Sequence, residues 1–355
     1  MRLFFCPCSE HTFRMYKHLV FCGGGTRVLL FMPSLVLLEN EGLLDTIHDY
    51  WGTSAGALLA AFMAITRSAK KTHKLLHEIQ YTHFRDIDVG NLFNINRTWG
   101  LDDGSSLMRE IERVFELIDP GASKKTLRDY PGIHIPVSDL NVHETVLLDS
   151  TTYPDLCIVD AIRATMSLPF LYMPYKYKPS GHYWIDGALR ANFPWNLLPN
   201  DTARHEALGF LFEKAWIGGP RNFSDYMFSM IHFDEPKKME KLKAEWPNNI
   251  LWYPTPPYPA WYMGLNTEDF SLIEEIGKRI GHKWLELRQK DDSSCPLNKT
   301  ETPGLCEGQN THPPSHPQHC IDESSGSRLP CLEPSRDSSR PQSHCTLSSF
   351  RRWSV

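Results

Sequence analysis

Strand-like and helix-like segments alternate along the first two thirds of the chain. Tyr16–Cys22 has the apolar, aromatic character of a buried strand, and three glycines follow it. Beyond the glycines, apolar spacing predicts a long helix to about Glu41, with Gly42 at its end and a kink at Pro33. The chain therefore starts with a predicted strand, a tight turn and a helix.

The same alternation continues to Phe212, and a last amphipathic helix follows. The predicted elements are a strand at Ile47–Trp51, a helix at Ala57–Ile65, paired strands at Ile133–Ser138 and Glu144–Asp149, a helix at Val159–Met166, short strands at His182–Ile185 and Ala207–Phe212, and a helix at about Thr267–Leu287. Such an order is typical of an α/β layer fold with a mostly parallel central sheet flanked by helices.

The composition changes sharply after the last predicted helix. Residues 291–355 contain 13 Ser and 8 Pro but only 9 large apolar, Ala or aromatic residues, too few to offset the entropy of ordering the segment. We therefore predict an N-terminal extension at 1–15, one folded domain at 16–289 and a disordered Ser/Pro-rich tail at 290–355.

Charge and hydropathy exclude several classes of protein. Lys+Arg 37 against Asp+Glu 42 gives a formal charge of −5, which argues against a nucleic-acid partner. The longest apolar stretch, Val28–Leu38, is far short of the roughly 20 residues that a transmembrane helix needs. The first residues carry too short an apolar run for a signal peptide, so the expected location is intracellular and cytoplasmic.

The sequence gives no clear sign of a metal site. The nine cysteines include no Cys-x-x-Cys pair, so free thiols are predicted. Asp102 and Asp103, with Glu110 and Glu112, are interpreted as a solvated turn and helix start rather than a cation site.

One turn has the pattern of a serine nucleophile. Gly52-Thr53-Ser54-Ala55-Gly56 fits Gly-x-Ser-x-Gly and lies between a predicted strand and a predicted helix. The glycines Gly52 and Gly56 permit a strained turn that exposes the Ser54 hydroxyl. The free N–H groups and dipole of the following helix favour the negative charge that develops during acyl transfer.

The glycine run before the first helix is a second candidate. Gly23, Gly24 and Gly25, followed by Thr26 and Arg27, present backbone N–H groups that suit an anion. A dinucleotide loop would need a further glycine at Val28, and a phosphate loop would need Gly-Lys-Ser/Thr. An oxyanion hole for Ser54 needs only that the two strand ends be neighbours.

A serine nucleophile also needs a base. His182, His205 and His232 lie downstream, but none has a distinguishing context. Asp186 ends a predicted strand, and Gly187 and Ala188 follow it in a tight turn. Asp-Gly alone is a common turn dipeptide, so the choice of base stays open on these grounds.

The ordered set of segments resembles the patatin-like phospholipases, lipid acyl hydrolases that use a Ser–Asp dyad. The shared features are Gly-Gly-Gly-x-Arg, then Gly-Thr-Ser-Ala-Gly, then Asp-Gly-Ala with Asn and Pro following, and the likeness covers about residues 16–215. It implies a three-layer α/β fold with Ser54 as nucleophile and Asp186 as general base. It also implies the Gly24 and Gly25 amides as oxyanion donors, with Arg27 near a substrate phosphate or bracing the loop.

The resemblance implies a phospholipase A-type enzyme or an acylglycerol lipase that works without metal or cofactor. Its substrate would be a phospholipid or a neutral lipid, reached by peripheral contact with a membrane or a lipid droplet. Three alternatives stay open: a Ser–His–Asp esterase, a peptidase, and a lipid- or partner-binding module with inactive catalytic loops. Val28 favours the last of these, because the family usually has a glycine there.

Overall fold

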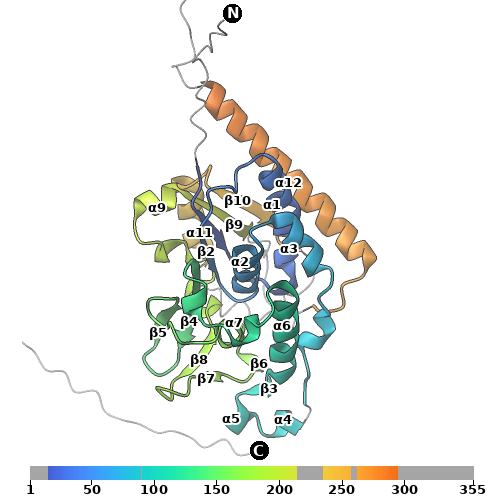
Figure 1. Ribbon diagram of the computed structural model, residues 1–355, viewed down its shortest axis with the longest axis vertical. Coiled ribbons are helices and arrows are strands. Elements are labelled where there is room, and N and C mark those ends of the chain that lie inside the picture. The colour runs from blue at the N-terminus through green and yellow to red at the C-terminus, as the bar shows by residue number, and fades with distance from the viewer. Residues whose placement is uncertain (1–14, 89, 214–234, 257–261, 295–355) are drawn as a thin grey trace, which may run out of the picture. The chain divides into compact units, whose positions relative to one another are not determined.

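The computed structural model describes residues 15–88, 90–213, 235–256 and 262–294. Within them, an eight-stranded sheet has the order β10-β9-β1-β2-β4-β8-β7, with β5 also paired to β4 (Figure 1). A separate two-stranded sheet joins β3 and β6. The strands are β1 (His18–Phe21), β2 (Asp49–Gly52), β3 (Gly100–Asp102), β4 (Ile133–Asp139), β5 (Glu144–Leu148), β6 (Phe170–Tyr172), β7 (Tyr175–Lys176), β8 (Tyr183–Asp186), β9 (Ala207–Glu213) and β10 (Ile250–Pro254).

Helices connect and cover these strands. The α-helices are α1 (Phe31–Asn40), α2 (Ala55–Thr66), α3 (Ala69–Leu76), α4 (Gly90–Phe93), α5 (Ile95–Thr98), α6 (Ser105–Ile118), α7 (Ile158–Thr165), α8 (Ala188–Ala191), α9 (Asp201–His205), α11 (Glu235–Glu245) and α12 (Thr267–Ser294). Short 3₁₀ helices are η1 (Gly25–Leu30), η2 (Tyr81–Phe84), η3 (Ala122–Lys124), η4 (Leu127–Asp129) and η5 (Pro194–Leu197).

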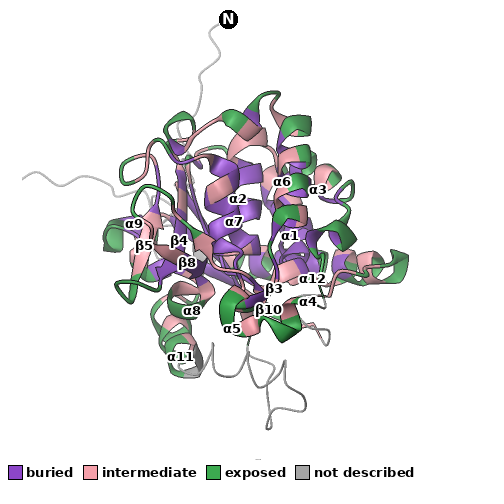
Figure 2. Ribbon diagram, turned by 90° about the horizontal axis from the view of Figure 1, so that it is seen from below, coloured by how far each residue is buried: buried purple, intermediate pink, exposed green. Residues whose placement is uncertain are grey.

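The strands β10, β9, β1, β2 and β4 run parallel to one another. The strands β5 and β8 pair antiparallel with β4, and β7 pairs antiparallel with β8. The helices α2, α6 and α7 lie on one face of the sheet, and α8 and α11 lie on the other (Figures 1 and 2). The prediction of a mostly parallel α/β sheet flanked by helices is confirmed, as is the pairing of β4 with β5.

The core lies between the sheet and α2. Every residue of α2 from Ala55 to Met63 is buried, as are all four residues of β1, so this helix is purple along most of its length in Figure 2. Small side chains such as Ala57, Ala60 and Ala61 let the helix lie close to the strands. The turn at the start of α2 is therefore fixed by packing on both sides.

Two predicted helices differ from those observed. The first begins as the 3₁₀ helix η1 and becomes α-helical at Phe31, so Pro33 falls in the first turn of α1. The observed element is therefore one helical run whose winding changes two residues before Pro33, which lacks the N–H that a regular helix needs. The last helix runs on to Ser294 and takes in residues 290–294 of the predicted tail.

The interpretation of Asp102, Asp103, Glu110 and Glu112 as a solvated turn and helix start was wrong for two of these residues. Asp102 is fully buried and accepts hydrogen bonds from the N–H groups of Asp86 and Gly104. Glu110 is 4% exposed and accepts from Arg113 and the Gln80 N–H. Backbone donors from distant residues supply what solvent would otherwise provide.

Three predictions lie outside the described residues: most of the N-terminal extension at 1–15, the tail from 295 on, and the thiols within them. Of the cysteines that are described, neither Cys22 nor Cys157 is in a disulfide. Across the described ranges, no helix combines the length and the hydrophobicity needed to cross a lipid bilayer.

Candidate active site

Ser54 occupies the sharp turn between β2 and α2. Its backbone has φ 54° and ψ −128°, a conformation that costs a non-glycine residue about 1–3 kcal/mol. The Ser54 N–H donates to Thr165 Oγ1 at 3.0 Å, and that hydroxyl donates to the Pro136 carbonyl at 2.7 Å. The strained turn is therefore held by α7 and β4.

The glycines on either side of Ser54 are required by close backbone approach. A Cβ atom on Gly52 would lie 2.2 Å from the Gly56 carbonyl oxygen, and one on Gly56 would lie 2.4 Å from the Cys22 carbonyl oxygen. Any side chain at these positions would force the start of α2 away from the ends of β1 and β2. The two glycines thus set the position of the serine.

Asp186 lies at the end of β8 and is 2% exposed. Its Oδ2 accepts a hydrogen bond from Ser54 Oγ at 2.7 Å, and its Oδ1 accepts from the Ala188 N–H at 2.8 Å. The Asp186 N–H donates to the Ser167 carbonyl, and the Asp186 carbonyl accepts from Ser138 Oγ. One carboxylate oxygen of Asp186 is therefore held by a backbone N–H, and the other accepts the hydrogen bond from the serine.

The strand β4 brings these two residues together. Its first residues pair with β2, where Trp51 lies opposite His134, and its last residues pair with β8, where Val137 lies opposite Asp186. Since β2 runs parallel to β4 and β8 runs antiparallel, the carboxyl-terminal ends of β2 and β8 approach each other along it. Residues 132 positions apart in the sequence meet there.

The glycine run lies beside the serine, because β1 and β2 are parallel neighbours. A Cβ atom on Gly23 would lie 3.2 Å from Ser54 Cβ, and the Gly23 N–H donates to the Asn192 carbonyl at 3.0 Å. Among the described residues, the N–H groups of Gly24 and Gly25 have no acceptor. Gly25 has φ 58°, which a glycine adopts without strain, and it opens η1.

The other residues of this loop face different surroundings. Thr26 is 4% exposed, and its hydroxyl donates to the Tyr262 carbonyl at 2.8 Å. Arg27 is half-buried, and Val28 is packed in the core. The structure therefore brings Gly23, Gly24 and Gly25 toward Ser54, whereas the Thr26 side chain fastens the loop to a distant segment.

Three residues that hold the site were not predicted from the sequence. Thr165 anchors the turn, Thr53 Oγ1 donates to the Ala191 carbonyl at 2.7 Å, and Asn192 accepts from Gly23. Asn192 Oδ1 is buried, and it lies 2.8 Å from where a Gly23 Cβ would be. Asn192 belongs to the motif that follows Asp186, so a signal for it existed in the sequence.

The histidines considered as alternative bases lie in other contacts. His182 Nδ1 is 2.7 Å from Asp139 Oδ2, and the His205 ring packs against Trp246. Burial opposes ionisation of Asp139, but hydrogen bonds from His182 and Trp184 keep the pKa of its carboxyl below the usual value. His232 lies outside the described residues. Among those described, Asp186 is the titratable group hydrogen-bonded to the Ser54 hydroxyl.

A mostly parallel sheet with a strained serine at a strand end places the chain among α/β folds that carry a nucleophile-type turn. A family model described as patatin-like phospholipase matches residues 19–199, just over half of the chain. The chain therefore belongs to the patatin-like phospholipase family, and the resemblance found in the sequence is confirmed. At the level of the family, its function is that of a lipid hydrolase.

Similar proteins include two curated sequences and the solved structure of a bacterial protein. YqhO of Bacillus subtilis is 27% identical over 293 residues, covering 75% of this chain and 96% of YqhO. R571 of Acanthamoeba polyphaga mimivirus is 22% identical over 222 residues, covering 60% of this chain and 74% of R571. The crystal structure of VipD from Legionella pneumophila shares the fold, with a TM-score of 0.50, 15% identity, and coverage of 77% of this chain and 67% of VipD.

Proposed function

We propose that this protein cleaves fatty-acyl esters of phospholipids or acylglycerols through a covalent intermediate on Ser54, with Asp186 as general base. The observation that carries the proposal is the 2.7 Å hydrogen bond from Ser54 Oγ to Asp186 Oδ2 at a strained turn. A carboxylate is a weak base for an alcohol in water, but burial and a fixed geometry make it effective.

The first half of the reaction forms the acyl-enzyme. Asp186 Oδ2 takes the Ser54 proton as Oγ attacks the ester carbonyl carbon, and the carbonyl electron pair moves onto its oxygen. Collapse of this intermediate breaks the bond to the leaving alkoxide, which takes the proton back from Asp186. A water molecule then repeats the sequence on the acyl-Ser54 ester, and a fatty acid leaves.

The Gly24 and Gly25 amides are proposed to hold the developing oxyanion. They open η1 at the end of β1, beside Ser54, and no described residue accepts from their N–H groups. Fixed donors of this kind contribute about 3–4 kcal/mol each to lowering the barrier. The Gly23 N–H already donates to Asn192 and takes no part in this.

A group of exposed apolar side chains supports contact with a lipid surface. We call it the apolar rim: Leu92, Phe93, Trp99, Phe170 and Leu189, all of them exposed. Phe170 on β6 pairs with Gly100 on β3, the residue that follows Trp99 in the chain. Phe170 also lies five residues after Thr165 of the site. Leu189 lies three residues after Asp186.

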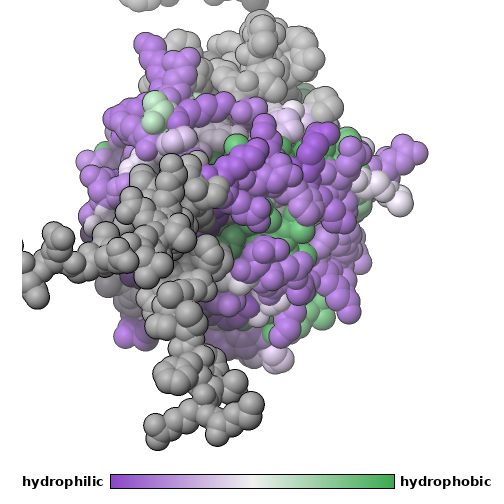
Figure 3. All heavy atoms as spheres, turned by 90° about the horizontal axis from the view of Figure 1, so that it is seen from above, coloured by the Kyte–Doolittle hydropathy of each residue, from purple (hydrophilic) through white to green (hydrophobic). Residues whose placement is uncertain are grey.

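The helices α4 and α5, which carry part of the apolar rim, lie at the bottom of Figure 1 and face the viewer in Figure 2. The opposite end, seen in Figure 3, is mostly hydrophilic, and its hydrophobic side chains lie in narrow bands between polar ones. Exposed aromatic and aliphatic side chains on one end suit the boundary between water and lipid. The proposed orientation places the site toward the lipid.

The proposal is tested by fatty-acid release from phospholipid vesicles and from acylglycerol emulsions. Ser54→Ala and Asp186→Asn should each lower kcat by more than about 10,000-fold, because both groups act in the transition state. A fluorophosphonate probe should label Ser54 in the wild type. Asp155→Asn, which changes an exposed carboxylate of the same type, is the matched control and should keep full activity.

Other outcomes point to the alternatives. Activity that survives Asp186→Asn would assign the base to a histidine. A wild type that neither releases fatty acid nor accepts the probe, yet binds the vesicles, would be a binding module.

A further inference from the structure

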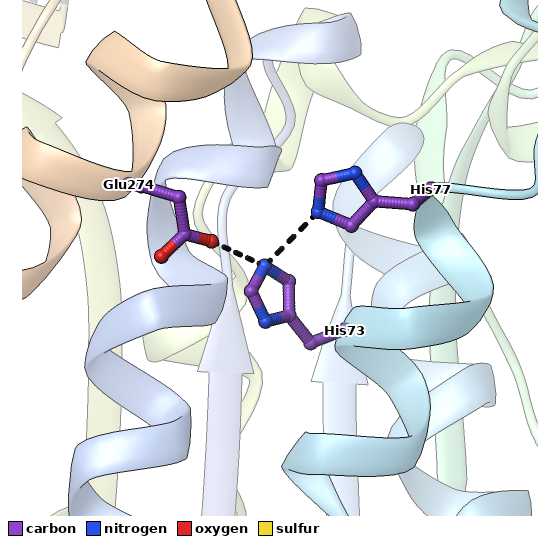
Figure 4. A group of neighbouring side chains, drawn as sticks. All are labelled: His73, His77 and Glu274. Atoms are coloured by element: carbon purple, nitrogen blue, oxygen red, sulfur yellow. Dashed lines mark hydrogen bonds and ion pairs between the residues drawn. The ribbon is translucent and has the colours of Figure 1, made fainter.

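Two histidines and a glutamate converge between α3 and α12, in a group that has no part in the proposed reaction. His73 lies on α3, His77 caps that helix four residues later, and Glu274 lies on α12. Residues four apart share a helix face, so both imidazoles point the same way. Figure 4 shows all three side chains directed at one point between the helices.

The distances are those of a ligand set. His73 Nε2 lies 3.3 Å from His77 Nε2 and 2.5 Å from Glu274 Oε1, and all three atoms lie within 4.8 Å of one another. Two nitrogens that are each about 2.05 Å from a tetrahedral zinc ion are about 3.3 Å apart. The two imidazoles already have this spacing, and Glu274 Oε1 would move about 0.8 Å away from His73 Nε2 to reach it.

Hydrogen bonding among the three side chains runs through one nitrogen atom. His73 Nε2 lies 2.5 Å from Glu274 Oε1, which is shielded from solvent, and 3.3 Å from His77 Nε2. The other oxygen of Glu274, Oε2, pairs with Lys278 Nζ at 3.0 Å. One imidazole nitrogen carries at most one proton and cannot donate to both neighbours, whereas a cation at the point of convergence would be bound by all three atoms.

Packing also holds one of the imidazoles in place. The Phe270 ring packs on His77, with ring centroids 4.7 Å apart, and limits its rotation. A ring held in this way loses less rotational freedom on binding a metal ion than a freely rotating surface histidine does.

We propose that His73, His77 and Glu274 bind one divalent transition-metal ion, with zinc as the best match to two imidazole nitrogens and one carboxylate oxygen. Water completes the tetrahedron, because the described residues supply three ligands. The ion ties α12 to α3, and α1 packs against both of these helices. The site is independent of Ser54 and Asp186, so its role is to fasten the last helix rather than to take part in ester cleavage.

The test uses the full chain after dialysis against a chelator. Co²⁺ should bind with a visible d–d spectrum and without the intense near-ultraviolet band of thiolate ligands, which separates this site from Cys295, Cys306, Cys320, Cys331 and Cys345. Zn²⁺ should slow amide hydrogen exchange in α3 and α12. His77→Gln and Glu274→Gln should each weaken binding at this site by more than about 100-fold and abolish that protection.

His83→Gln replaces an exposed histidine outside the cluster and is the matched control; it should bind as the wild type does. Because His77 is itself exposed, its replacement should leave the fold intact, which circular dichroism checks. The proposal is overturned if the wild type takes up no metal at 100-fold excess over protein. It is equally overturned if the variants and the wild type show the same affinity and the same exchange protection.

Discussion

The hydroxyl of Thr165 links three parts of the candidate site. It accepts from the Ser54 N–H and donates to the Pro136 carbonyl, so it ties the strained turn to β4. Thr165 is fully buried. It touches no reacting atom, so its role is to position the serine.

Replacing Thr165 with valine keeps the shape and removes both hydrogen bonds. We expect kcat to fall about 10- to 100-fold with KM nearly unchanged, because the turn relaxes away from the reacting geometry. The free energy of unfolding should fall by about 1–3 kcal/mol, since a buried donor and a buried acceptor lose their partners. Steady-state kinetics and urea unfolding measure the two effects.

The conservative change Thr165→Ser keeps the hydroxyl and should retain most of the activity. Equal kcat values for Thr165→Val and the wild type would show that Thr165 does not position Ser54.

At the level of elements, the close packing of α12 against α1 leads to a prediction about stability. The Gly277 carbonyl accepts a hydrogen bond from Ser34 Oγ at 2.6 Å. A Cβ atom on Gly277 would lie 2.7 Å from the Leu30 carbonyl oxygen and 2.8 Å from the Pro33 ring. Neither neighbour can move without shifting the start of α1.

Two effects therefore compete in Gly277→Ala. Alanine gains about 1 kcal/mol of helix propensity, but overpacking costs about 1–3 kcal/mol and displacement of the Ser34 bond costs about 1 kcal/mol more. We expect a net loss of about 1–3 kcal/mol in the free energy of unfolding, measured in urea. Ser271→Ala, an exposed change on the same helix, should stay within about 0.5 kcal/mol of the wild type.

Most of the elements around the site could be predicted from local patterns. The strands near Tyr16–Cys22 and Ala207–Phe212 and the helix after Ser54 are strongly apolar, so their existence was clear even where their ends moved. The strand β10 was not predicted, because four apolar residues between Asn249 and Pro254 carry little signal. Its place is decided by pairing with β9, about 40 residues earlier.

The residues of the site likewise divide into those that local motifs predict and those that depend on packing. Ser54 and Asp186 follow from motifs that are local in the sequence, and the pairing of β1 with β2 explains why the glycine run lies nearby. Thr165 could not be found in this manner, because its role depends on how α7 packs against the turn. The cluster of His73, His77 and Glu274 likewise needs the packing of α12 to be known.

At the scale of the whole molecule, a largely buried ionic cluster of Asp49, His134 and Asp149 links β2, β4 and the end of β5. His134 on β4 has Nδ1 3.4 Å from Asp149 Oδ2 and Nε2 3.7 Å from Asp49 Oδ1, and its ring stacks on Trp51. Burial opposes ionisation of all three groups. Hydrogen bonding and charge attraction outweigh burial, so the pKa of His134 is raised and those of Asp49 and Asp149 are lowered.

These shifts predict how stability depends on pH. The contribution of His134 is complete below its ordinary pKa of 6.5 and is lost as pH rises through the raised value. The contribution of the two aspartates is present above their ordinary pKa of 3.8 and is lost as pH falls toward the lowered values. This group therefore stabilises the fold most between about pH 4 and 6.5.

Urea unfolding of the wild type and of His134→Gln, from pH 4 to pH 9, measures the effect. The difference in unfolding free energy between the two proteins should shrink as pH rises above 6.5. His83→Gln should follow the wild type at every pH. A difference that stays constant across this range would mean that the pKa of His134 does not change on folding.

The position of β1 in the sheet has a consequence for synthesis of the chain. This strand leaves the ribosome well before β9, and it lies between β2 and β9, with His18 opposite Ala207. At about 5–20 residues per second, the 189 residues from His18 to Ala207 take about 10–40 s to translate. Throughout that interval the edge of β1 that will pair with β9 has no partner, and Leu19, Val20 and Phe21 of this strand are apolar. An unpaired apolar edge can pair with another chain, so the nascent chain must be kept apart from other chains until β9 has been made.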